Sequence, residues 1–164
     1  MYLPDHDVTL EPLTAEHADA VLAFERENRA YFAAWIEDRG DDFFTSFAER
    51  HQALLAEQET GTCRFHVLVD AVGAVVGRVN LMDLENGSAE LGYRIAEKAT
   101  GRGLASAAVR ALARLAASEY GLTMLRAGTS DRNVASQAVL TRAGFRRVAD
   151  PAAHLGFELK LEDL

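Results

Sequence analysis

The chain has 164 residues, of which 49% are hydrophobic and 26% charged, and its formal net charge is −8. Its length predicts one domain, spanning residues 1–164, and its composition is typical of a globular protein. The acidic balance argues against a nucleic-acid partner, which needs a basic face, and no apolar run reaches membrane-spanning length. It also weakly favours a cationic acceptor such as an amine.

Redox and targeting signals are few. Cys63 is the single cysteine, so a disulfide framework and a cysteine metal site are excluded. The histidines, His154 among them, lack metal-ligand spacing, and we expect no bound metal. The first seven residues lack the basic start and apolar stretch of a signal peptide, so we expect a cytoplasmic protein.

The first half of the chain predicts a strand, two helices and a hairpin. Alternation indicates strands, apolar residues three or four apart indicate helices, and the Gly73 region carries turn chemistry. The predicted elements are a strand Val8–Leu13, a helix Ala15–Asn28 with Thr14 as N-cap, a loop Trp35–Asp42, a helix Asp42–Glu59, and strands Phe65–Val69 and Val75–Leu81 joined by Asp70–Ala74.

The second half begins with a strong turn signal at Asn86-Gly87. The predicted elements that follow are a strand Ala89–Ile95, a helix Leu104–Ser118 with buried Leu104, Ala108, Leu112 and Leu115, a strand Thr123–Thr129 parallel to Ala89–Ile95, a helix Val134–Ala143 closed by Gly144, and strands Phe145–Val148 and Leu155–Leu161. This order predicts an α/β fold: a mixed, mostly antiparallel sheet with one parallel strand pair, flanked by helices.

The segment Thr100–Ala105 lies between a predicted strand and a predicted helix. Small residues there let a ligand approach the backbone, and the first amides of a helix bind anions such as a pyrophosphate. The P-loop is excluded because no Gly-Lys-Ser/Thr triplet occurs, and Ser106 stands at the third glycine of the dinucleotide fingerprint. A Gly-x-Gly-x-Ala element remains, with a tight packed turn as the alternative.

Downstream segments resemble the GNAT superfamily of N-acetyltransferases. There a strand leads into Q/R-x-x-G-x-G/A, and a later N-x-x-S element opens a helix that ends in G-F. The matching residues are Gly103 and Ala105, then Asn133 and Ser136, then Gly144 and Phe145. The spacing of Glu90-Leu91-Gly92-Tyr93 is most similar to the ribosomal-protein serine/alanine N-terminal acetyltransferase branch, as is Asn28-Arg29 followed by Phe32 and Trp35.

This resemblance implies an acyltransferase fold that binds acetyl-CoA. Loop amides would hold the pyrophosphate, and strand backbone would pair with the pantetheine arm as if it were an added strand. Asn133 would bind pantetheine, cap the last helix, or do both. The implied cofactor-binding residues are Tyr93, Arg94, Ile95, Thr100, Gly101, Arg102, Gly103, Leu104, Ala105, Ser106, Asn133 and Ser136.

Two departures from the family pattern affect the chemistry. Thr100 stands where Gln or Arg is usual, and Leu140 stands where many members carry a tyrosine that protonates the departing thiolate. We therefore assign the thiol side to Ser136. Glu90, on the strand face shared with Gly92, is the candidate general base or water-relay group, with an ordinary exposed carboxylate as the alternative.

The aromatic and acidic residues Tyr31, Phe32, Trp35 and Asp38 lie where the family shapes its acceptor pocket. The expected reaction is acetyl transfer by direct attack in a ternary complex, with a protein N-terminal amine as the leading acceptor. A small-molecule amine, such as an antibiotic or a polyamine, is the alternative among enzymes. A non-catalytic acyl-CoA-binding module and a nucleotide-binding structural domain stand outside that class, and both monomer and homodimer stay open.

Overall fold

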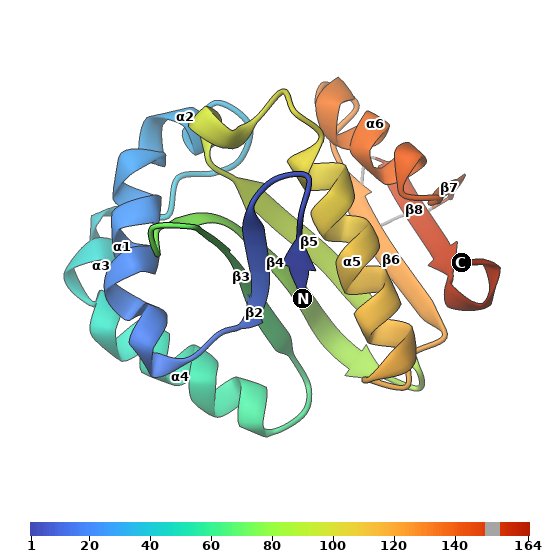
Figure 1. Cartoon of the computed structure of the whole chain (residues 1–164), viewed down its shortest axis with the longest axis horizontal. Helices are drawn as coiled ribbons and strands as arrows, with labels where there is room; N and C mark the ends of the chain where they lie inside the picture. The colour runs from blue at the N-terminus through green and yellow to red at the C-terminus, as the bar shows by residue number, and fades with distance from the viewer. Residues whose placement is uncertain (150–154) are drawn as a thin grey trace.

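The structure is a computed structural model that describes residues 1–149 and 155–164, so His154 lies outside the described residues. Within these residues, eight strands form one sheet in the order β1-β2-β3-β4-β5-β6-β8-β7 (Figure 1). The strands are β1 (Tyr2–Leu3), β2 (Val8–Pro12), β3 (Arg64–Asp70), β4 (Val75–Glu85), β5 (Ser88–Ile95), β6 (Met124–Thr129), β7 (Arg146–Val148) and β8 (Leu155–Lys160).

The helices come in two groups, one before the central strands and one after them. They are α1 (Ala18–Glu27), α2 (Arg29–Ala33), α3 (Asp41–Thr45), α4 (Phe47–Glu59), α5 (Leu104–Ser118) and α6 (Val134–Arg142), with 3₁₀ turns η1 (Ala15–His17), η2 (Glu97–Ala99) and η3 (Leu161–Asp163).

Strand direction follows the prediction. Every neighbouring pair is antiparallel except β5 and β6, which run parallel because α5 carries the chain back across the sheet. The β4–β5 hairpin turns at Asn86 and Gly87, whose φ angles of 51° and 78° are those that a tight hairpin needs. The mixed, mostly antiparallel sheet with one parallel pair is confirmed.

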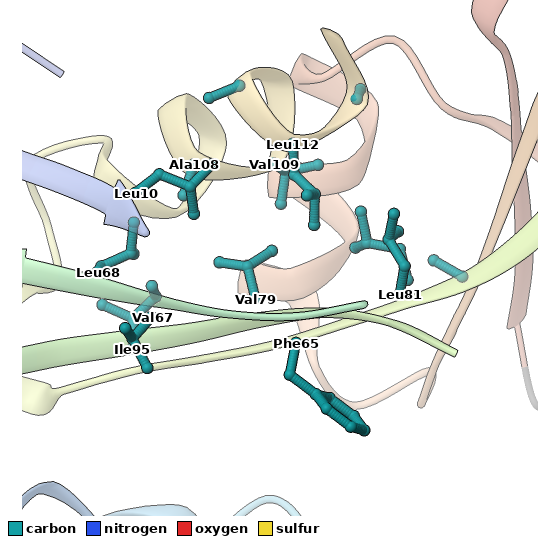
Figure 2. Packing of buried hydrophobic residues seen from close by; sticks show 14 of the residues in the cluster. Leu10, Phe65, Val67, Leu68, Val79, Leu81, Ile95, Ala108, Val109 and Leu112 are labelled. Carbon is teal, nitrogen blue, oxygen red and sulfur yellow. The ribbon is translucent and has the colours of Figure 1, made fainter. Parts of the chain in front are cut away.

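The core has a layer on each side of the sheet. Figure 2 shows Leu68, Val79 and Leu81 between the sheet and α5, whereas Phe65 points away toward the opposite face. Helix α5 presents a continuous small and apolar stripe to the first layer, and Leu112 is fully buried there. Helices α1 and α4 pack on the second face, against β4 and β3. Leu115, predicted to be buried, is only half-buried.

Two predicted helices had wrong bounds, and one strand was missed. The predicted helix Ala15–Asn28 opens with η1 and ends at Glu27, after which α2 begins inside the aromatic segment. The predicted helix Asp42–Glu59 is broken at Ser46, because the hydroxyls of Thr45 and Ser46 bond to the carbonyl of Asp42 and compete with the helical ladder. Strand β1 is too short to carry an alternation signal, so the sequence analysis missed it.

Candidate active site

The parallel strands β5 and β6 separate partway along their length. They pair from Ser88 and Met124 up to Glu90 and Arg126, beyond which no further rung joins their described residues. Strand β5 stays paired with β4 as far as Ile95. The separation opens a pocket of about 270 Å³ whose walls come from β5, β6 and α6.

The free edge of β5 offers backbone groups to this pocket. The amide of Ala96 donates to the carbonyl of Val76 on β4, at 2.9 Å. Since backbone groups of successive strand residues point to opposite edges, the amides and carbonyls of Tyr93 and Ile95 point toward β6. An extended polar chain entering the gap would find them as a strand finds its neighbour. The pantetheine arm of a coenzyme has this shape.

Beside the pocket, the N-terminus of α5 is built to bind an anion. Its N-cap is Gly103, with φ of 79° and no side-chain cap, and its first turn holds no acidic residue. A Cβ atom added at Gly101 or Gly103 would meet no other atom within 4 Å, so neither glycine is packed against another part of the protein. The unpaired amides of the first turn and the helix dipole suit a pyrophosphate.

The side chains of this loop point elsewhere. The hydroxyl of Thr100 donates to the carbonyl of Glu97 at 2.7 Å, and the guanidinium of Arg102 reaches the carbonyl of Lys98 at 3.3 Å. The Leu104 side chain is buried in the core, and Ala105 is half-buried. The cradle therefore consists of backbone amides, and the unusual Thr100 leaves it intact.

Ser106, the third residue of α5, is buried, and its hydroxyl has no hydrogen-bond partner among the described residues. Ser106 lies in the first turn of α5, so its amide is one of those that have no hydrogen-bond partner within the helix.

Tyr93 and Ser136 meet on the α6 side of the pocket. The Tyr93 hydroxyl donates to Oγ of Ser136 at 3.2 Å, and the amide of Ser136 donates to Oδ1 of Asn133, which thereby caps α6. Burial raises the pKa of Tyr93, and the hydrogen bond to Ser136 opposes this effect in part. Leu140 is buried and lines the same wall, so it offers no proton.

Arg94 does not join the other predicted cofactor residues. Its backbone faces β4, and its guanidinium lies 3.4 Å from the carboxylate of Glu25 and 5.0 Å from the centre of the Phe32 ring. Arg39 and Arg78 each approach the same carboxylate at 3.1 Å. Burial lowers the pKa of Arg94 to about 10. Sequence reasoning missed this buried cluster.

The predicted acceptor residues divide between the pocket and its support. Trp35, which is 52% exposed, lines the pocket, and Phe32 packs behind it against Tyr31 at 5.7 Å between ring centres. Asp38 instead pairs with Arg29 at 2.8 Å, and this guanidinium holds the pKa of Asp38 at about 2. The Asp38 carboxylate is therefore committed to a loop contact.

Glu90 occupies the last rung before the strands separate. Its register partners are Met82 on β4 and Arg126 on β6, and it lies on the sheet face opposite Leu91, as alternation predicts. The residue is half-buried and two positions from Gly92, which lines the pocket.

Asn28 connects the two sides of the site. Its amide nitrogen donates to the carbonyl of Phe24 at 2.9 Å, and its Oδ1 accepts from the amide of Glu97 at 3.0 Å. The buried side chain thus ties the end of α1 to η2, the turn that leads into the anion cradle.

A sheet opened at its parallel pair, with an anion-binding helix end beside the opening, defines an acyltransferase that takes its acyl group from a coenzyme A thioester. The chain belongs to the GNAT family: the model of the acetyltransferase (GNAT) domain matches residues 7–146. It is an N-acetyltransferase, and acetyl-CoA is its acyl donor.

Known relatives agree with this assignment. The probable N-acetyltransferase YjcK of Bacillus subtilis (strain 168) is 28% identical over 148 residues, which cover 85% of this chain and 81% of that protein. RimJ of Mycobacterium smegmatis, solved with CoA-disulfide, is 25% identical and superimposes with a TM-score of 0.85 over 99% of this chain and 86% of that one.

Two further solved structures share the fold. Ribosomal-protein-S5-alanine acetyltransferase from Vibrio fischeri has a TM-score of 0.87 at 18% identity, covering 96% of this chain and 94% of that one. Spermidine N-acetyltransferase from Vibrio cholerae, in complex with CoA and spermine, has a TM-score of 0.77 at 16% identity, covering 95% of this chain and 96% of that one. At these identities the two structures show a shared fold, and their acceptors differ. Among the described residues, no helix is both long and apolar enough to span a membrane.

Proposed function

We propose that this enzyme acetylates the α-amine of a protein or peptide N-terminus. The observation that supports this acceptor is the pocket lining. Of the described side chains that line it, none is charged, and Trp35 and Ile36 supply an exposed apolar wall. An uncharged pocket favours an amine that arrives neutral, since it offers an ammonium no counter-charge.

The amine pKa then separates the candidate acceptors. An α-amine has a pKa of about 7.7–8.0, so a substantial minority of it is neutral at physiological pH. A lysine-like alkyl amine has a pKa of about 10.4 and is almost entirely charged there. A pocket without carboxylates is suited to the first kind.

A polyamine is the second candidate, favoured by the net charge of −8 and by the likeness to spermidine N-acetyltransferase. A polycation needs carboxylates that are free to receive it. Arginines hold Glu25, Asp38 and Asp41 in ion pairs, but Glu37 and Asp42 are exposed in the same segment, so the preference for the N-terminal amine depends on the uncharged lining of the pocket.

In the proposed reaction, the amide of Tyr93 donates to the carbonyl oxygen as negative charge develops on it. Glu90, which lies beside the pocket and not among the residues that line it, accepts the proton of the amine through water, and Ser136 donates to the departing sulfur. The amides from Gly101 to Ser106 hold the pyrophosphate.

The acceptor test compares the rate of free thiol release from acetyl-CoA with two amine sets. One set holds short peptides with free N-terminal serine or alanine and the same peptides with blocked N-termini. The other holds spermidine and spermine. We expect turnover with the free peptides only. Turnover with the polyamines and none with the peptides would reverse the assignment, and no turnover at all in a protein that binds coenzyme A would favour a binding module.

Coenzyme binding is tested separately at the cradle. At a hundred times its dissociation constant, coenzyme A stabilises the native state by about 2.7 kcal/mol, which corresponds to a rise in melting temperature of about 5–10 °C for a domain of this size. Gly103→Val should abolish this rise, because a branched residue disfavours the positive φ of Gly103 and would change the turn that presents the amides.

The matched control is Gly61→Val. Gly61 has a φ of 82° and open surroundings like those of Gly103, but it follows α4, away from the cradle. The control should carry the same backbone strain and keep the coenzyme A shift. An equal shift in both variants would remove the cradle from the proposal.

A further inference from the structure

The hydroxyl groups of Tyr93 and Ser136 form a pair at the wall of the pocket. Tyr93 is on β5, where its amide points into the gap and its side chain reaches toward α6. Ser136 is held twice, by its amide on Asn133 and by its Oγ, which accepts from Tyr93. The serine hydroxyl is therefore fixed in position with its own proton available for another acceptor.

From this geometry we infer that Tyr93 is a proton-relay residue that acts through Ser136 on the departing thiolate. The inference rests on the proposed acetyl transfer. It fills the role that Leu140 leaves vacant on α6, and it places the phenol on a neighbouring strand instead of on the helix.

The relay balances over one turnover. The amine nitrogen forms a bond to the acetyl carbon, and the carbon–sulfur bond breaks with its electron pair staying on sulfur. Ser136 gives its hydroxyl proton to that sulfur while Tyr93 gives its own proton to Oγ of Ser136. The proton lost by the amine, taken up by Glu90 or water, returns through solvent to the phenolate. The products are the amide and the free thiol.

The phenol is a reserve of this proton because tyrosine, with an ordinary pKa of about 10, is protonated at physiological pH. Burial raises the pKa of Tyr93 further, and the hydrogen bond to Ser136 opposes this rise, which favours release of the proton along that bond. A hydrogen bond donated to serine also polarises the serine O–H bond, because linked hydrogen bonds strengthen one another. Thr129 and Ser130 also line the pocket, at and just after the end of β6, but neither accepts a hydrogen bond from the Tyr93 hydroxyl, which donates to Ser136.

The test uses Tyr93→Phe, Ser136→Ala and the double variant, with acetyl-CoA and an accepted amine. Tyr93→Phe should lower kcat by about tenfold to a hundredfold and leave the dissociation constant of coenzyme A within about twofold. The double variant should be no slower than Ser136→Ala, because both residues serve one proton path. Tyr120→Phe is the control: it removes the hydrogen bond of a half-buried tyrosine to His66, and Tyr120 follows the C-terminal end of α5, at the other end of the helix from the cradle.

A second readout needs no acceptor. The ultraviolet absorbance of the thiolate gives the pKa of coenzyme A bound to each variant. The pair donates toward sulfur, so it should lower this pKa, and Tyr93→Phe should raise it by about one unit, a change that a purely structural role would not produce. An unchanged thiol pKa, or a kcat within twofold of the parent while the parent turns over, would overturn the relay. If the unmodified enzyme does not bind coenzyme A, the proposed function itself is overturned.

Discussion

The buried carboxylate of Glu25 gives the sharpest stability prediction. Its side chain is 2% exposed and accepts from Arg39, Arg78 and Arg94 at 3.1, 3.1 and 3.4 Å. Glu25→Gln keeps the shape and removes the charge, which leaves the Arg78 guanidinium, itself 6% exposed, without a counter-ion. Breaking a buried pair in this way costs about 3–5 kcal/mol.

That loss is a large part of the total stability of a domain, which is about 5–15 kcal/mol. For a chain of this length it corresponds to a fall in melting temperature of about 6–20 °C. Urea denaturation followed by circular dichroism measures it, and the slope with denaturant should not change.

The control is Glu27→Gln, two residues further along α1. Glu27 is 59% exposed and lies 3.8 Å from Lys98, so its loss should cost less than about 1 kcal/mol. The reasoning fails if Glu25→Gln unfolds at the same urea concentration as Glu27→Gln.

Two predictions concern pH. Glu90→Gln should lower kcat at least about tenfold, spare coenzyme A affinity and remove the acidic limb of the pH–rate profile; a limb that persists in the variant counts against the base assignment. Burial lowers the pKa of His66 to about 4 in the folded protein, whereas a histidine in the unfolded chain has a pKa of about 6.5. The unfolded chain therefore binds a proton that the folded one excludes, and stability should fall by about 3 kcal/mol as pH drops from about 6.5 to about 4. The melting temperature should depend less on pH in His66→Gln than in the parent across this range. An equal dependence on pH in both proteins would disprove the effect.

The sequence was most informative where backbone geometry dictates residue type. Glycines at 101 and 103 have the positive φ that a tight strand-to-helix turn needs, and Asn86-Gly87 closes its hairpin as predicted. Helix α5 spans Leu104–Ser118, as its apolar stripe and small residues indicated. These signals are local, so a single sequence carries them.

Contacts between distant side chains were beyond such reasoning. Tyr93 and Ser136 are 43 positions apart, and their hydrogen bond depends on how α6 settles against the sheet. The sequence did carry a sign of the Glu25 cluster: α1 buries Val21, Phe24 and Glu25, and its C-cap Asn28 is buried one turn further on, so two polar residues interrupt an apolar stripe. A carboxylate in that place predicts a buried partner, but periodicity does not name the arginines.

The Asn28 bridge has a consequence for how acceptor choice can change. Because the Asn28 side chain bonds both to the end of α1 and to η2, we expect a displacement of α1 to disturb the turn that leads into the cradle. A shift of α1 that admits a bulkier acceptor would therefore also displace the cradle and weaken the binding of acetyl-CoA. Substitutions that change acceptor choice should therefore avoid Asn28 and its partners. The exposed Trp35 and Ile36, which line the pocket, are the first positions to vary.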